Sequence, residues 1–246
     1  MPTQTPLMVT LVFAVLAATV AALATWGAAL ATAPVGTPAQ RLAPRLLVGV
    51  AAAAVWMTAW ALVARTGALL RFDHRPPPMM LMMAAAGAAA IAIGASPLGS
   101  RLARLPLVAL VGFQAFRLPL ELVMDRAARA GAMPLQMSFE GWNFDVVTGA
   151  TALVVAALLL VGRAPRWLVV AWNVLGVVLL ANILAIAVAS TPVFHAFGTA
   201  PGAVNTWVGV APFVWLPTVF VACAIAGHIV LTRRLLADAQ RARPNV

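Results

Sequence analysis

Residues 114 to 125 read QAFRLPLELVMD and place polar side chains inside a stretch that is otherwise apolar enough to span a membrane. Four of these side chains fall within an arc of roughly 80° on an α-helix and therefore form one stripe. The stripe consists of Gln114, Arg117, Glu121 and Asp125. A charge at the centre of a bilayer costs roughly 2.5 to 3.5 kcal/mol, so we expect the stripe to face protein or water and to serve a function. Pro119 lies on the opposite face, where it removes the donor to the carbonyl of Ala115 and favours a kink or hinge.

The composition of the whole chain is that of a polytopic membrane protein. Of its 246 residues, 63% are hydrophobic and only 9% are charged, whereas an average globular protein has about 25% charged residues. Every basic residue is arginine, which excludes a retinal protein, because retinal is held as a Schiff base on lysine. The net charge of +10 comes from arginines scattered between apolar runs, which fits acidic lipid headgroups better than nucleic acid. The single cysteine, Cys223, excludes an internal disulfide.

Seven segments match the length of about 20 apolar residues that a transmembrane helix requires. They cover approximately residues 6–32, 44–64, 78–97, 105–125, 143–162, 167–189 and 211–231. The segment 190–210 is rich in Gly, Pro and Thr and is expected to form a loop, and a short arginine-rich tail is expected after residue 231. The N-terminus has no basic region, which argues against a cleaved signal peptide. We therefore predict an all-α bundle of seven transmembrane helices that forms a single domain over residues 1–246.

The arginines also predict how the chain lies in the membrane. With the N-terminus outside, the inner loops and the tail would hold ten of them: Arg41, Arg45, Arg101, Arg104, Arg163, Arg166, Arg233, Arg234, Arg241 and Arg243. The outer loops would hold five: Arg65, Arg71, Arg75, Arg126 and Arg129. Because basic residues are enriched on the cytoplasmic side, this distribution predicts an N-terminus outside and a C-terminus inside.

In that orientation the polar stripe meets a second polar segment near the outer face. The sequence QMSFEGWNFD brings Glu140, Asn143 and Asp145 to the start of the fifth span. Arg117 and Glu121 are one helical turn apart and could pair within their helix. Two interpretations are open: a structural ion pair that joins two helices, or an outward-facing pocket between the fourth and fifth spans that binds a small polar ligand, a lipid headgroup or a cation. Alternatively, Asp145 stabilises the start of a helix that Asn143 caps.

Three further polar residues and one proline are secondary candidates. Asn173 and Asn182 are nine residues apart, which places them about 180° apart on a helix and prevents both from facing one pocket. His228 is expected near the inner end of the seventh span, where it could form a structural hydrogen bond to a neighbouring helix or relay protons. Pro217, in the same span, is a second candidate hinge.

The sequence does not favour a metal centre or a nucleophilic active site. The three histidines, His74, His195 and His228, fall in loops and spans that cannot share one site, which disfavours zinc and bis-histidine haem. An oxygen site for a hard cation, built from the carboxylates of the two polar segments, stays an alternative. No G-x-S-x-G motif or glycine-rich phosphate loop is present. We predict no metal and no cofactor, and whether the chain is an enzyme stays open.

Several segments together resemble a known group of proteins. QAFRLPLEL, MSFEGWNFD, WNVLG, NTW and FVWLP are similar to segments of uncharacterised bacterial seven-span integral membrane proteins, a group without a known activity. The resemblance covers approximately residues 113 to 232 and implies a multi-pass protein of the bacterial cytoplasmic (inner) membrane. It also implies that the recurring segments of the group contain Gln114, Arg117, Pro119, Glu121, Glu140, Asn143, Asp145, Asn173 and His228.

Three functions remain in contention on the sequence. The first is a non-enzymatic protein that binds, and could transport, a small polar ligand or ion in the outward-facing pocket. The second is a membrane-embedded enzyme that uses Glu121 or Glu140 as a general acid or base on a lipid or an exported substrate. The third is a structural or assembly subunit whose polar stripe docks another membrane protein. The expected partners are the lipid bilayer and one of these ligands or proteins.

Overall fold

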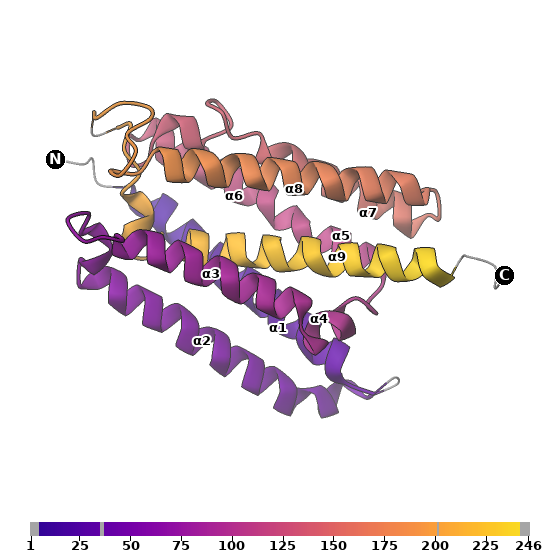
Figure 1. The fold of residues 1–246 in the computed structure, drawn as a ribbon. Coiled ribbons are helices and arrows are strands. Elements are labelled where there is room, and N and C mark those ends of the chain that lie inside the picture. Colours follow the sequence, from indigo (N-terminus) through magenta and orange to yellow (C-terminus); the bar gives the residue numbers. More distant parts are fainter. Residues whose placement is uncertain (1–4, 35–36, 201, 242–246) are drawn as a thin grey trace.

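Helices run back and forth between the two ends of a bundle in the computed structural model of the chain (Figure 1). The structure describes residues 5–34, 37–200 and 202–241. Within these residues every regular element is a helix, as the sequence predicted. The longer α-helices are α1 (Leu7–Thr32), α2 (Ala43–Arg65), α3 (Pro78–Ala95), α6 (Arg117–Arg129), α7 (Asp145–Leu160), α8 (Arg166–Ala189) and α9 (Ala222–Arg241).

Shorter helical elements lie between these or extend them. They are α4 (Pro97–Leu102), α5 (Leu107–Phe113), the 3-10 turns η1 (Ala39–Leu42), η2 (Ala68–Leu70), η3 (Gln114–Phe116), η4 (Leu135–Met137) and η5 (Trp207–Gly209), and the π-helical turn η6 (Leu216–Val221). The elements α5, η3 and α6 form one continuous helical run, and η6 continues directly into α9.

Six helical runs are long and apolar enough to cross a membrane. They are α1, α2, α3, Leu107–Arg129, α8 and Leu216–Arg241. The helix α7 is also apolar but has 16 residues, and it runs beside α8 (Figure 1).

The predicted bounds of the last span, 211–231, are wrong. Residues 211–214 form a turn, and the helix continues to Arg241. The segment expected to be a tail is helical because its charges are spaced for a helix: Asp238 accepts hydrogen bonds from Arg234 (2.8 Å) and Arg241 (2.5 Å), four and three residues away.

Proline marks the first turn of most of these helices. The residues Pro6, Pro77, Pro106 and Pro165 directly precede α1, α3, α5 and α8, and η6 has Pro217 in its first turn. Proline is tolerated there because the first backbone N–H groups of a helix have no partner within the helix. Pro217 thus lies in the first turn of the last helical run, and its role as a hinge stays a prediction.

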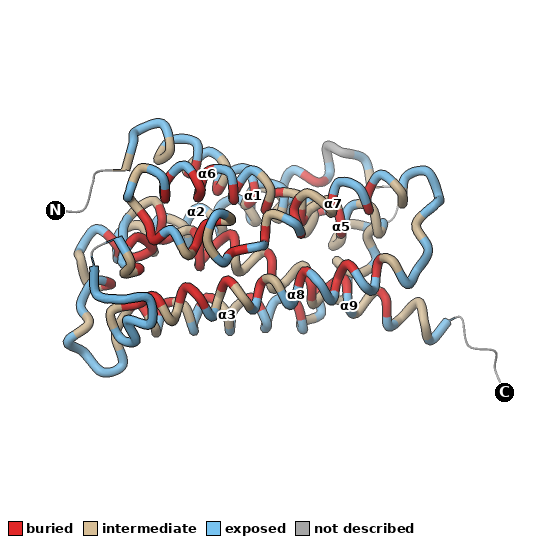
Figure 2. Tube along the Cα trace, turned by 90° about the horizontal axis from the view of Figure 1, so that it is seen from above, coloured by how far each residue is buried: buried red, intermediate tan, exposed pale blue. Residues whose placement is uncertain are grey.

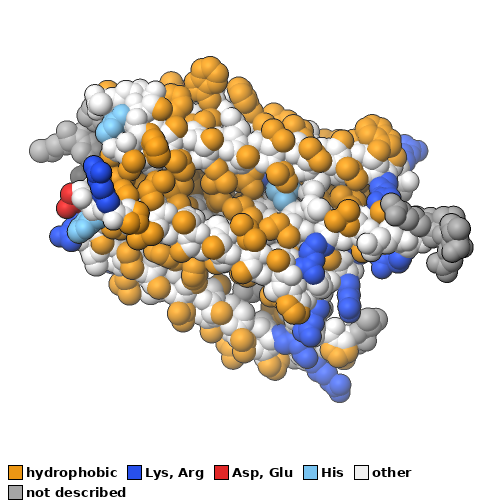
Figure 3. All heavy atoms as spheres, viewed as in Figure 1, with side chains coloured by type: hydrophobic (Ala, Val, Ile, Leu, Met, Phe, Trp, Pro, Cys, Tyr) orange, Lys and Arg blue, Asp and Glu red, His pale blue; other side chains and the backbone are white. Residues whose placement is uncertain are grey.

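Apolar side chains cover the outer surface of the bundle, and arginines gather at the end that carries the C-terminus (Figure 3). Along α2, Leu47 and Val48 are 71% and 70% exposed. Burial in water-free surroundings would stabilise such side chains by roughly 25 cal/mol per Å² of apolar surface, so an extensive apolar exterior fits a lipid environment. Figure 2 shows that buried positions recur along the helices, with exposed and intermediate positions between them.

An aromatic cluster closes the end of the bundle that carries the N-terminus. The ring of Phe13, on α1, makes edge contacts with Trp207, Phe213 and Phe220 at centroid distances of 5.1–5.6 Å. Trp207 and Phe213 belong to the second half of the long connection between α8 and η6, and this half packs into the core. Residues 193–200, in its first half, are exposed.

Candidate functional site

The helical run that carries the polar stripe departs from α-helical geometry near its centre. Between α5 and α6 the chain forms the 3-10 turn η3, immediately before Pro119. Pro119 cannot donate to the carbonyl of Ala115, and this loss explains why the regular α-helical pattern is interrupted there. Pro119 itself is exposed, whereas all four stripe residues are buried. The polar stripe therefore faces the interior of the protein, as expected.

Arg117 is the centre of the buried polar network. Its guanidinium is 1% exposed and forms a bidentate ion pair with Asp145 at the start of α7. Arg117 Nε donates to Asp145 Oδ2 at 2.6 Å, and Nη2 donates to Oδ1. The predicted pairing with Glu121 in the same helix is wrong. A planar guanidinium matches a carboxylate that faces it squarely, and the neighbouring helix supplies that carboxylate.

His228 joins this network from α9. Its Nε2 lies 2.8 Å from Arg117 Nη1, and its Nδ1 lies 2.9 Å from Asn173 Oδ1 on α8. Since a guanidinium only donates, Nε2 must accept, so the imidazole is neutral with its proton on Nδ1. Asn173 Nδ2 in turn donates to Thr232 Oγ1 at 2.9 Å. Four helices are linked through this one cluster of hydrogen bonds.

His228 lies halfway along the helical run Leu216–Arg241, which has 26 residues. Gly176 on α8 provides the space for its ring, because a Cβ there would come within 2.4 Å of the imidazole Cε1. The histidine was expected to bond a neighbouring helix, and it does, but its contact with Arg117 was not anticipated.

Glu121 is held differently from the other carboxylates. It is 2% exposed, and its Oε2 accepts a hydrogen bond from Asn143 Nδ2 at 2.7 Å. Asn143 also donates to the carbonyl of Met137 (3.0 Å) and accepts from the backbone N–H of Asp145 (3.1 Å). The N-cap position of α7 is occupied by Phe144, not by Asn143 as predicted. From the position before it, Asn143 still bonds the first residue of the helix and fixes Glu121 as well. Among the described residues, Glu121 Oε1 has no hydrogen-bond partner.

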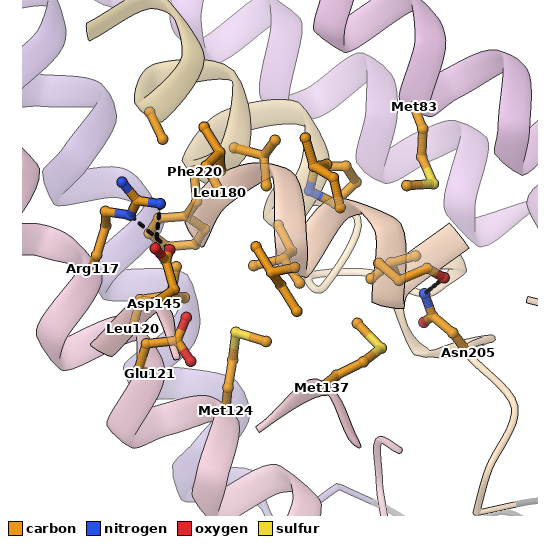
Figure 4. A pocket seen from close by; sticks show the side chains of 18 of the residues that line it. Met83, Arg117, Leu120, Glu121, Met124, Met137, Asp145, Leu180, Asn205 and Phe220 are labelled. Atoms are coloured by element: carbon orange, nitrogen blue, oxygen red, sulfur yellow. Dashed lines mark hydrogen bonds and ion pairs between the residues drawn. The ribbon is translucent and has the colours of Figure 1, made fainter. Parts of the chain in front are cut away.

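A cavity of about 50 Å³ lies beside these groups (Figure 4). Arg117, Glu121 and Asp145 form its polar wall. The remaining walls are mostly apolar and come largely from α8 and from the run η6–α9, which the sequence did not associate with the pocket. They include Met83, Met124, Met137, Leu180, Ile183, Leu216, Pro217 and Phe220.

Asn205 contributes a second polar group to the cavity, at the end away from Arg117 (Figure 4). Its side chain is 0% exposed, and Nδ2 donates to the carbonyl of Ala187 at 3.1 Å. A carbonyl only accepts hydrogen bonds, so the amide atom that faces it must be the nitrogen. The amide oxygen, Oδ1, is then buried without a partner. Sequence reasoning missed Asn205, although it begins the NTW segment of the loop.

No family model, curated protein or solved structure matches the chain. Function is therefore argued from the chemistry of the site.

Several predicted site residues lie elsewhere. Arg129 bridges the buried Asp125 (Nε to Oδ2, 2.8 Å) and the exposed Glu140. Neither carboxylate lines the cavity. Gln114 is buried against Gly227 of α9, one turn from Arg117, and also lies outside the cavity lining. The carboxylates considered for a hard-cation site are thus divided between separate partners. In the part of the chain that the structure describes, no three His, Cys, Asp or Glu side chains are placed to hold one metal ion.

The two asparagines of α8 point to different partners, as their spacing predicted. Asn173 belongs to the network of His228, whereas Asn182 donates to the carbonyl of Trp142 at 2.7 Å. Neither lines the cavity.

We expect Asn143→Ala to lower the free energy of unfolding by about 1–3 kcal/mol, because the substitution leaves buried hydrogen-bonding groups without partners. Unfolding can be followed by the loss of helicity during a titration of detergent-solubilised protein with sodium dodecyl sulfate. Asn182→Ala is the matched control, since Asn182 donates one bond at a partly exposed position. Equal losses for the two variants would contradict the role assigned to Asn143.

Proposed function

We propose that the chain is a seven-span integral protein of the bacterial inner membrane that binds a small cation, or a small polar ligand with N–H or O–H donors, in the cavity beside Glu121. The observation that carries the proposal is that the cavity holds two acceptors without a donor among the described residues, Glu121 Oε1 beside Arg117 and Asn205 Oδ1 at the other end. An ionisable residue inside a membrane bundle is a functional candidate by default, because it is costly to keep there.

The proposal of seven spans rests on α7. The helix before it, α6, ends at the end of the bundle that carries the N-terminus, and the helix after it, α8, begins at the opposite end (Figure 1). The helix α7 therefore runs from one end of the bundle to the other. Its 16 residues correspond to roughly 24 Å at 1.5 Å per residue, short of the typical hydrocarbon thickness of about 30 Å. Local thinning of the bilayer accommodates such a difference at modest cost.

The proposed orientation has the C-terminus in the cytoplasm. It is supported by the arginines gathered at the end of the bundle that carries the C-terminus (Figure 3). The cavity then lies in the outer half of the membrane, because Glu121 and Asn205 belong to elements that lead toward the N-terminal end of the bundle. We also propose that the chain belongs to the bacterial seven-span group, on the basis of the sequence segments that resemble it.

The charge balance of the polar wall favours a cationic partner. The charges of Arg117 and Asp145 cancel within their bidentate pair, and His228 is neutral in its hydrogen-bonding arrangement. An ionised Glu121 therefore leaves one negative charge in excess. A volume of about 50 Å³ has room for a few water-sized groups, at about 10–15 Å³ each. A small ion or a compact ammonium compound fits this space.

The proposal is tested by comparing the wild type with Glu121→Gln. Purified protein is examined by native mass spectrometry for a bound species and is then titrated with sodium, ammonium and methylammonium chlorides while thermal unfolding is recorded. We expect one cation to stabilise the wild type by about 2.7 kcal/mol at 100 times its Kd, and Glu121→Gln to weaken binding at least tenfold, or about 1.4 kcal/mol.

The matched control is Glu140→Gln. It makes the same chemical change at an exposed carboxylate that does not line the cavity, so cation binding should be unchanged. The proposal is wrong if Glu121→Gln responds to each cation as the wild type does. If binding is found, flux into proteoliposomes will decide whether the protein also transports the ligand.

The two other functional hypotheses have less geometric support. The assembly hypothesis needs the polar stripe on the exterior of the bundle, whereas its four side chains are 1–5% exposed. The enzymatic hypothesis needs two carboxylates flanking a substrate groove. Asp145 is occupied by Arg117, and Glu140 lies at the surface with Arg129, which leaves Glu121 without a second free carboxylate.

A further inference from the structure

A groove separate from the polar wall of the cavity runs between α8 and α9, which lie side by side on one face of the bundle (Figure 1). Its volume is about 340 Å³, larger than that of the cavity. Residues such as Val177, Ala181, Leu184, Ile225 and Ile229 make most of its lining apolar, and Arg233 is one of its few polar residues. In a bilayer this groove faces hydrocarbon.

Arg233 lacks a carboxylate partner within ion-pair distance among the described residues. Its Nη1 donates to the carbonyls of Gly94 (2.7 Å) and Ser96 (3.0 Å), and its Nη2 donates to Ser100 Oγ. All three acceptors are neutral, so the charge of this half-buried guanidinium is not compensated. By contrast, Arg234 and Arg241 both pair with Asp238. The Nε–H of Arg233 has no described partner and is free to donate.

The position of Arg233 matches the level of lipid headgroups. It donates to the carbonyl of Gly94, in the last turn of α3, and to that of Ser96, which directly follows this helix. Arg101, on α4, and Arg163, between α7 and α8, are exposed and lie toward the same end of the molecule (Figure 1). An apolar groove between two membrane helices that leads to an uncompensated arginine at the interface is the arrangement that anionic lipid headgroups occupy.

We infer that this groove holds an acyl chain of an anionic phospholipid whose phosphate pairs with Arg233. The apolar lining supplies the contact with the chain, and the guanidinium supplies a charge-assisted hydrogen bond to a phosphate oxygen. A transmembrane helix of a partner protein would cover the groove but would leave the charge of Arg233 uncompensated unless it brought its own acid. This site does not depend on ligand binding at Glu121.

The test measures lipid retention by the full chain. Detergent-purified protein is incubated with phosphatidylglycerol or phosphatidylcholine of the same acyl composition, and bound lipid is counted by native mass spectrometry. We expect the wild type to retain phosphatidylglycerol at least fivefold more than phosphatidylcholine. Arg233→Gln should abolish this preference, whereas Arg163→Gln, which removes the same charge at the same end, should keep it.

A second variant keeps the test informative if Arg233→Gln folds poorly. Ala181→Phe fills the groove but leaves Arg233 and its three acceptors intact, and it should lower phosphatidylglycerol retention at least fivefold. Unchanged retention in Ala181→Phe, or equal retention of both lipids by the wild type, would overturn the inference. Displacement of the lipid by millimolar inorganic phosphate would likewise overturn it, since the anion alone would then be the ligand.

Discussion

Replacing Arg117 with methionine is expected to lower the free energy of unfolding by about 3–5 kcal/mol, the usual cost of removing one partner of a buried ion pair. Methionine keeps much of the side-chain volume but leaves the carboxylate of Asp145, which is 5% exposed, without its counter-charge. It also leaves His228 Nε2 without the donor that it faces. The loss is read from the shift of the unfolding transition in sodium dodecyl sulfate, with the slope of the transition compared with that of the wild type.

The double variant Arg117→Met, Asp145→Asn separates the ion pair from simple packing. Removing both charges should recover a substantial part of the loss, because the uncompensated carboxylate is then absent. Arg163→Met, at an exposed arginine whose side chain has no described hydrogen bond, should cost less than about 0.5 kcal/mol, as most surface substitutions do. A loss below about 1 kcal/mol for Arg117→Met would mean that the network does not hold the helices together.

Local patterns in the sequence predicted the stripe and most of the long apolar helices, because each depends on one continuous segment of the chain. The positions of Gln114, Arg117, Glu121 and Asp125 along one helix determine that they share a face, and the structure buries all four. An apolar segment of membrane-spanning length can likewise be recognised from its own sequence, without knowledge of the helices that pack against it. The inward direction of the stripe followed from the cost of exposing charge to lipid.

The pairing of the buried charges could not be read from the same patterns. Arg117 and Asp145 are 28 residues apart, and their contact depends on how α6 and α7 are aligned along their axes. Spacing within the helix suggested Glu121 as the partner, but a contact within one helix competes with any carboxylate that a neighbouring helix presents in better geometry. Asn205 was missed for a related reason, since a loop residue has no period that predicts its direction.

The end of the last helix was missed because the arginines of TRRLLADAQR suggested that it ended near residue 231. In the structure the ion pairs of Asp238 continue the helix to Arg241, so that His228 lies halfway along the helical run. The contacts of His228 with Arg117 and Asn173 join three different helices, and the pattern of one helix does not predict them.

Gly149→Ala is expected to destabilise the protein by about 3 kcal/mol, the upper part of the usual range for overpacking. Gly149, on α7, faces the backbone of α6, and a Cβ there would lie 2.2 Å from the amide nitrogen of Leu118. Backbone atoms cannot rotate away, so the two helices must separate. The free energy of unfolding is measured as for Arg117→Met. Gly87→Ala is the control, because a Cβ at Gly87 on α3 would meet no atom within 4 Å, and the higher helix propensity of alanine should then stabilise by up to about 1 kcal/mol.

The same variant also tests why α6 and α7 approach so closely. Gly149 lies one turn beyond Asp145, so the contact that it allows is also the contact that brings the carboxylate to Arg117. If the close approach serves the ion pair, Gly149→Ala will cost much less in the background of Arg117→Met than in the wild type, because the pair is already lost. Additive losses would instead show that the packing of the two helices and the ion pair stabilise the protein independently, and a Gly149→Ala variant as stable as the wild type would contradict the close contact itself.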